Sequence, residues 1–266
     1  MTSKKKLIIP KITNKIDKNL LKQLNMTFSQ KFMNHEPAKR LIRRNKVYDP
    51  VFKELFFLHN LITLNKRLTI LEIGSGWSTM FLYHALKQNR KKYENQTRLL
   101  RGMNKFEIFV LENDKKYFKI TKKKLEKISE KNTKINWCYS DVVMSQFEGR
   151  YCTVYKSFPK VNPDFIYLDG PDIFKVKGKI NNFDANHGDF MPMVSDLLRI
   201  EFYLIPGTII VVDGRAANVQ FLQSFFKRKW LYYYVKDIDK HIFFLDARSL
   251  GLANDLTLNF YGKKND

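Results

Sequence analysis

Residues 68–79 read LTILEIGSGWST, and this stretch decides the fold of the chain. Leu68–Gly74 is a short, nearly continuous apolar run that ends in glycine, which predicts a buried strand. A helical pattern begins at Ser78. A strand that runs into a glycine pair and then a helix lets the backbone approach a ligand closely, because glycine has no Cβ and tolerates positive φ. Ser78 or Thr79 can cap the helix, whose free N–H groups point to the same place.

Strand and helix patterns alternate on from this stretch, which is typical of an α/β sheet with crossover helices. The last two apolar runs, 231–235 and 241–245, are joined by KDIDK and predict an antiparallel hairpin. We therefore expect an α/β fold with a mostly parallel seven-stranded sheet, an antiparallel terminal hairpin strand and helices on both faces. The other strands are expected at Phe106–Glu112, Ile135–Asp141, Asp164–Gly170 and Thr208–Gly214, and the helices at 51–65, 78–88, 114–131, 189–204 and 215–229.

The composition fits one large domain with an appendage. The chain has 266 residues, of which 44% are hydrophobic, so it can bury a sizeable core and is not a disordered tail. Residues 1–48 form a basic N-terminal extension with two short amphipathic patterns, at 18–24 and 38–44. Pro50 marks a break, and 49–266 are predicted to form the α/β domain.

The formal net charge of +22 has two interpretations. The chain is rich in Lys, Asn, Ile, Phe and Tyr together, as an AT-rich coding bias produces, and most lysines are then solvated surface. The alternative is a field that attracts nucleic acid, anionic membranes or phosphorylated substrates. No apolar run approaches the roughly 20 residues that cross a bilayer. The two cysteines, Cys138 and Cys152, lack metal-ligand spacing, and we expect a cytoplasmic protein.

Acids or glycines stand at five successive predicted strand ends, where open α/β sheets bind their ligands. Glu112 can accept two hydrogen bonds from a ribose diol, and Asp141 can meet an adenine amino group. Any one of these acids could instead cap a helix. The fourth strand ends in Asp169-Gly170-Pro171-Asp172 and the fifth in Asp213-Gly214-Arg215.

On these residues the chain resembles the class I S-adenosylmethionine-dependent methyltransferases, which have a Rossmann-like fold, over about residues 51–246. The Gly-x-Gly-x-Ser-Thr form is similar to that of the small-molecule O-methyltransferase branch. Two departures are an inserted basic loop at 90–105 and a long loop at 171–188. The resemblance implies that S-adenosylmethionine is held by Glu72, Gly74, Ser75, Gly76, Ser78, Thr79, Glu112, Asn113, Asp141, Val142 and Asp169.

Two mechanisms of methyl transfer fit the residues. In one, Asp169 and Asp213, alone or with Asp172, hold Mg²⁺, as some O-methyltransferases of the resembled family do at these strand ends. In the other no metal binds, and His187 or one of the acids is the general base. Arg215 can pair with an anionic substrate or form a salt bridge to Asp213 or Asp172.

The favoured function is O-methylation of a small molecule, sugar or glycan, with the acceptor and the oligomeric state open. Alternatives are a nucleic-acid-modifying methyltransferase that uses the basic extension, and a non-catalytic binding protein with this fold. The fourth strand lacks the Asn/Asp-Pro-Pro-aromatic motif of amino-methylating DNA enzymes, which lowers the nucleic-acid hypothesis. A nicotinamide-dependent dehydrogenase is disfavoured, because its fingerprint requires glycine or alanine where Thr79 stands and an acid nearer than Glu112.

Overall fold

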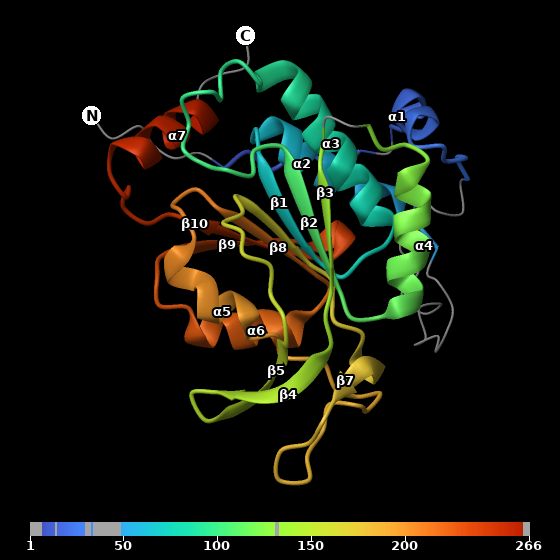
Figure 1. Ribbon diagram of the computed structural model, residues 1–266, viewed down its shortest axis with the longest axis vertical. Helices are drawn as coiled ribbons and strands as arrows, with labels where there is room; N and C mark the ends of the chain where they lie inside the picture. The colour runs from blue at the N-terminus through green and yellow to red at the C-terminus, as the bar shows by residue number, and fades with distance from the viewer. Residues whose placement is uncertain (1–6, 14, 30–32, 34–48, 131–132, 263–266) are drawn as a thin grey trace.

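The computed structural model describes residues 7–13, 15–29, 33, 49–130 and 133–262 (Figure 1). Its large sheet has seven strands in the order β3-β2-β1-β6-β8-β10-β9. Only β10 runs antiparallel, to both of its neighbours, so the predicted fold class and the terminal antiparallel strand are confirmed. The strands of this sheet are β1 Thr69–Ile73, β2 Glu107–Glu112, β3 Ile135–Tyr139, β6 Phe165–Leu168, β8 Ile209–Asp213, β9 Trp230–Val235 and β10 Lys240–Leu245.

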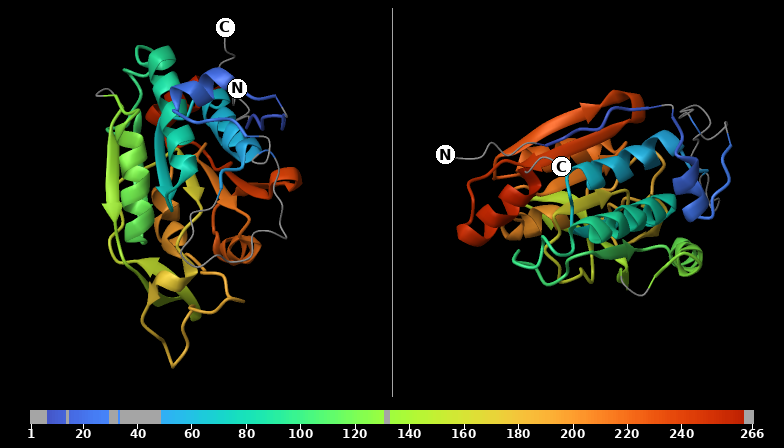
Figure 2. Two further views of the ribbon diagram at one scale, coloured as in Figure 1. Left: turned by 90° about the vertical axis from the view of Figure 1, so that its right-hand side faces the viewer. Right: turned by 90° about the horizontal axis from the view of Figure 1, so that it is seen from above.

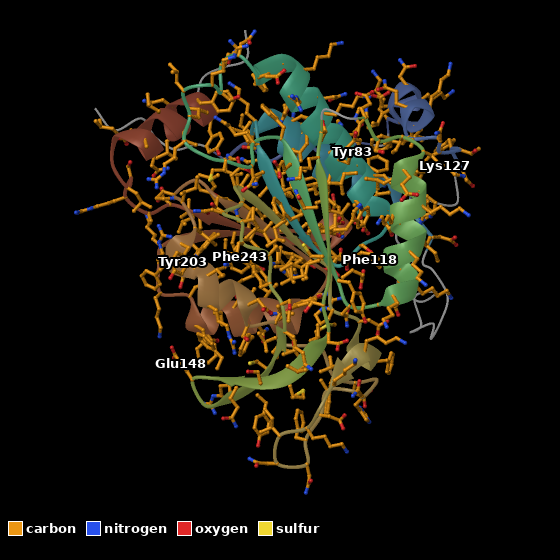
Figure 3. The ribbon with its side chains drawn as sticks, in the orientation of Figure 1. Tyr83, Phe118, Lys127, Glu148, Tyr203 and Phe243 are labelled. Carbon is orange, nitrogen blue, oxygen red and sulfur yellow. The ribbon has the colours of Figure 1, made fainter. Side chains whose placement is uncertain are left out.

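Helices cover both faces of this sheet, because its strands are apolar on both sides. Ile70 packs into one buried cluster and its neighbour Leu71 into the other, as side chains alternate along a strand. Phe243 of β10, labelled in Figure 3, packs in the second cluster. The first face carries α2 Phe52–Leu64, α3 Trp77–Tyr93 and α4 Lys115–Glu126, and the second carries α5 Asp196–Ile200 and α6 Ala216–Phe225 (Figures 1 and 2).

The strand order places a topological switch point between β1 and β6. From β1 the chain builds outward through β2 to β3, and it then returns to add β6 and β8 on the other side. The crossovers from β1 and from β6 therefore leave in opposite directions, which opens a crevice at the carboxyl ends of these two strands. The predicted acids and glycines lie at this edge.

A second, three-stranded sheet, which the sequence did not predict, lies beyond that edge (Figure 1). It consists of β4 Val142–Phe147, β5 Arg150–Tyr155 and β7 Val176–Lys177 in the order β5-β4-β7. Glu148, labelled in Figure 3, lies at the tip of the β4–β5 hairpin, where it adopts φ of 44°. The sheet joins the chain that follows β3 to the chain that follows β6.

Two element boundaries differ from the expected ones. The helix expected from residue 189 begins only at Asp196, because Pro192 disfavours helix in the residue before it and Val194 forms a bridge with Thr153. Helix α3 continues to Tyr93, into the segment expected to be an inserted loop. A further helix, α7 Leu252–Gly262, was not expected. Its Tyr261 ring lies 3.9 Å from the guanidinium carbon of buried Arg67.

The described part of the basic extension packs on the domain. Helix α1, Lys18–Gln23, is confirmed, and the Asp17 carboxylate caps it by accepting from the Leu20 N–H at 2.9 Å. Leu20 and Leu21 are buried in the first cluster. The helix expected at 38–44 lies outside the described residues, and the domain boundary at residue 48 stays a prediction. Within the described chain, no helix combines the length and apolarity that a bilayer crossing requires.

Candidate functional site

A pocket of about 940 Å³ opens at the carboxyl ends of the central strands. Its walls come from the turn after β1, the end of β2, the loops after β6 and β8, and helices α2 and α4. The predicted residues that line it are Gly74, Ser75, Gly76, Ser78, Glu112, Asp169, Asp172, Asp213 and Arg215.

The two glycines of the turn have different reasons for being glycine. Gly74 has φ of +100°, and a Cβ there would lie 2.9 Å from the Gly170 backbone nitrogen, so the fold itself requires glycine. Gly76 has an extended φ of 176°, and no atom lies within 4 Å of the place where its Cβ would be. Thr79 Oγ1 accepts from the Gly76 N–H at 3.0 Å and caps α3. The space beside Gly76 is therefore an open cradle at a helix N-terminus.

Glu112 is held rigidly at the end of β2. Its Oε1 accepts from the N–H groups of Asn113 and Asp114, both at 2.7 Å, and its Oε2 accepts from the Ser75 hydroxyl at 2.7 Å. Burial raises the pKa of this carboxyl, and the three donors lower it again. With two acceptor sites on each oxygen, one site on Oε2 stays available to a ligand.

Glu72 lies beneath the turn and does not line the pocket. It is fully buried, and its Oε1 accepts from the Ser78 hydroxyl at 2.6 Å. Burial raises the pKa of Glu72 to about 8, although hydrogen bonds from Ser78 and Thr79 act in the opposite direction. The carboxyl therefore holds its proton at neutral pH and supports the turn as a neutral group.

The acids at the ends of β6 and β8 meet a lysine that the sequence analysis missed. The Lys240 side chain of β10 is fully buried, and its Nζ donates to Glu54 Oε2 of α2 at 2.8 Å and also to Asp213 Oδ1. Burial alone would lower the pKa of Lys240, but the carboxylates of Asp213 and Glu54 raise it. An ammonium group thus lies in the floor of the pocket.

Asp169 faces the pocket beside Asp213, with 42% of its side chain accessible. Its position deep in the pocket raises the pKa of the Asp169 carboxyl, and the charge of Asp213 raises it further. Arg215 fixes the backbone here: its Nη2 donates to the Asp169 carbonyl oxygen at 2.5 Å and its Nη1 to that of Pro171 at 3.3 Å. The predicted salt bridge of Arg215 to Asp213 or Asp172 gives way to these carbonyls and to a longer contact, 3.9 Å, with the Asp169 carboxylate.

Four other predicted residues do not line the pocket. Asp141 pairs with Lys177 Nζ at 2.8 Å, outside it. Val142 is buried in strand β4. Asn113 and His187 do not line it either: Asn113 Oδ1 accepts from the Asp172 N–H at 3.2 Å, and the His187 side chain is 60% exposed.

The pocket also has lining residues that the sequence gave no reason to single out. Lys124 of α4 holds its Nζ 3.2 Å from the ring centroid of Trp77, the first residue of α3. Burial lowers the pKa of Lys124. In the sequence, Lys124 is one of several lysines on a strongly charged helix, and only the helical spacing of Tyr117, Ile120 and Thr121 marks the side of α4 that lines the pocket.

The acids at these strand ends do not fit a divalent cation. Asp213 already contacts the Lys240 ammonium, and Gly214, the next residue, offers no side-chain donor. Across the described residues, no group of three or more His, Cys, Asp or Glu side chains is arranged to hold a metal. We therefore derive no step through Mg²⁺.

No family model matches the chain, and no curated protein matches it. Three solved structures are similar at low identity. The O-methyltransferase TomG from Streptomyces achromogenes, in complex with SAM, is 15% identical over 88% of this chain and 92% of that chain, with a TM-score of 0.42. The O-methyltransferase from Bacillus cereus, in complex with SAH, is 15% identical over 87% and 92%, with a TM-score of 0.39. The SAH-bound methyltransferase PaMTH1 from Podospora anserina is 14% identical over 87% and 89%, with a TM-score of 0.42.

Proposed function

We propose that this chain is an S-adenosylmethionine-dependent methyltransferase that methylates an oxygen of a small molecule or sugar. The observation that carries the proposal is the open cradle at Gly76, which faces the same pocket as Glu112 at the switch point of the sheet. A turn of this kind lets a ligand touch the backbone at a helix N-terminus, and the carboxylate recognises a diol. Together they match a nucleoside that carries an amino-acid tail.

The chain's own residues would divide the cofactor between them. Gly74 shapes the turn, and Gly76 leaves room for the methionine part. Glu112 offers its remaining Oε2 acceptor site to a ribose hydroxyl. The adenine contact expected of Asp141 stays a prediction, because that carboxylate is paired with Lys177 outside the pocket.

When bound, S-adenosylmethionine supplies a methyl group on a sulfonium, which leaves as a neutral thioether when the new carbon–oxygen bond forms. The chain must then take one proton from the acceptor hydroxyl. Asp169 is best placed for this role, since it faces the pocket and burial and Asp213 raise its pKa, which makes it a stronger base. Arg215 orients the backbone that carries Asp169. His187, the other predicted base, lies on the exposed loop outside the pocket.

Calorimetric titration with S-adenosylmethionine tests the proposal. We expect saturable binding to the wild type, and binding at least about tenfold weaker to Gly76→Ala, since a methyl group would fill the cradle. Because no atom of the protein lies within 4 Å of that Cβ, Gly76→Ala should melt at the wild-type temperature. No binding to the wild type, or equal binding to both proteins, would contradict the proposal.

A further inference from the structure

Lys240 occupies an unusual position for a lysine. Its side chain has no accessible surface, and the side chains of its two acidic partners, Glu54 and Asp213, are only 8% and 16% accessible. Three elements bring these groups together: helix α2, strand β8 and strand β10. In the antiparallel register Lys240 lies directly opposite Asp213.

The hydrogen bonds of this ammonium are satisfied by the protein. Nζ has three donors, and it contacts Glu54 Oε2, Asp213 Oδ1 and the Ile238 carbonyl oxygen, the last at 3.2 Å. Burying a charge in this way is costly unless the charge is paired and its donors are used. Lys240 meets both conditions, so it stays in place as a fixed positive charge.

The pocket needs a positive charge at this point. Glu54, Asp213 and Asp169 all line it, so three carboxyl groups converge on one wall. The ammonium lies between two of them, on the side away from the opening. A divalent cation placed on Asp213 would be repelled by the neighbouring ammonium, and it would compete with Lys240 for the same carboxylate oxygen.

We infer that Lys240 is the resident cation of this pocket: it takes the place between the acids at which a divalent cation would otherwise bind, and methyl transfer proceeds without a metal. The statement about transfer rests on the proposed function, and the statement about the cation does not. Lys240 is a positioning residue, because it acts on the reacting atoms only through Asp213 and, beyond it, Asp169.

The test is a titration with Mn²⁺ alone, followed by electron paramagnetic resonance, with no cofactor present. The wild type should bind Mn²⁺ weakly. Lys240→Ala leaves uncompensated acids and the volume of the lost side chain, so it should bind one Mn²⁺ at least about tenfold more tightly. The double variant Lys240→Ala/Asp213→Asn should lose this gain. Lys66→Ala is the matched control, because Lys66 is also buried but its Nζ approaches the Phe260 carbonyl oxygen, at 3.4 Å.

Two results would overturn the inference. One is tight binding of a single Mn²⁺ to the wild type that Asp213→Asn abolishes. The other is a folded Lys240→Ala protein, by circular dichroism, that gains no affinity over the wild type and the Lys66→Ala control. If Lys240→Ala does not fold, the wild-type titration against Asp213→Asn decides alone. Calorimetry with S-adenosylmethionine on the same samples reports on the proposed function separately, because the Mn²⁺ titration requires no cofactor.

Discussion

Glu112→Gln is the substitution that isolates one oxygen of the ribose-binding carboxylate. A glutamine carbonyl can replace Oε1 and keep both backbone hydrogen bonds, from Asn113 and Asp114. Its amide nitrogen then replaces Oε2, and the Ser75 hydroxyl can turn to accept from it. The loop after β2 should therefore keep its shape, while the pocket loses an acceptor and a negative charge.

The size of the effect follows from the hydrogen bonds that Glu112 already makes. Three of its four acceptor sites are used within the protein, so a ligand hydroxyl has one left. A hydrogen bond to a charged group contributes about 1.5–3 kcal/mol. We therefore expect S-adenosylmethionine to bind about 10- to 100-fold more weakly to Glu112→Gln, with an unchanged melting temperature.

Isothermal titration calorimetry with S-adenosylmethionine and S-adenosylhomocysteine measures this difference. The control is Glu107→Gln at the opposite end of the same strand, where the carboxylate accepts from Asn104 and Asn136 and does not line the pocket. The control should bind both ligands as the wild type does. If Glu112→Gln binds as tightly as Glu107→Gln, Glu112 does not hold the ligand and the pocket assignment is refuted.

Three further substitutions test the groups around the pocket. The folded pKa of Glu72, about 8, lies above the model value of 4.5, so its contribution to stability is full below the unfolded pKa and is lost as pH rises through the folded one. Urea unfolding should show the wild type losing about 2 kcal/mol more than Glu72→Gln between about pH 6 and about pH 8, and parallel curves would contradict this. Gly74→Ala should lower stability by roughly 2 kcal/mol or more in thermal melts, because it combines positive φ with a clash at the Gly170 nitrogen. Arg215→Lys should cost about 1–2 kcal/mol in urea unfolding, because a lysine cannot donate to two carbonyl oxygens as the guanidinium fork does; equal midpoints would show that this clamp is unimportant.

The large sheet could be predicted because its strands carry their own signals. Leu68–Gly74 is apolar, short and bounded by glycine, and Thr208–Gly214 repeats that form after a Pro-Gly turn. Both lie in the sheet where their patterns predict, as β1 and β8. The glycine turn and Glu112 could be placed at the pocket for the same reason, since the carboxyl ends of parallel strands share one edge.

The sequence could not predict groups whose meaning depends on distant partners. Lys240 follows the KDIDK turn and resembles any solvated lysine, yet its acidic partners lie 186 and 27 residues away along the chain. Asp141 stands at a strand end like Glu112, but β4 begins at the next residue, and the Asp141 carboxylate pairs with Lys177 outside the pocket.

Strand β4 begins two residues after β3 ends, and its Val142 pairs with Val176 of β7, whose segment also lines the pocket. The wall that follows β3 and the wall that follows β6 are therefore sewn together by backbone hydrogen bonds. As the sequence diverges, an insertion or deletion in either segment must be matched by the other, or the seam slips out of register. Acceptor specificity in such a protein should change by exchange of side chains along this seam more readily than by a change in loop length.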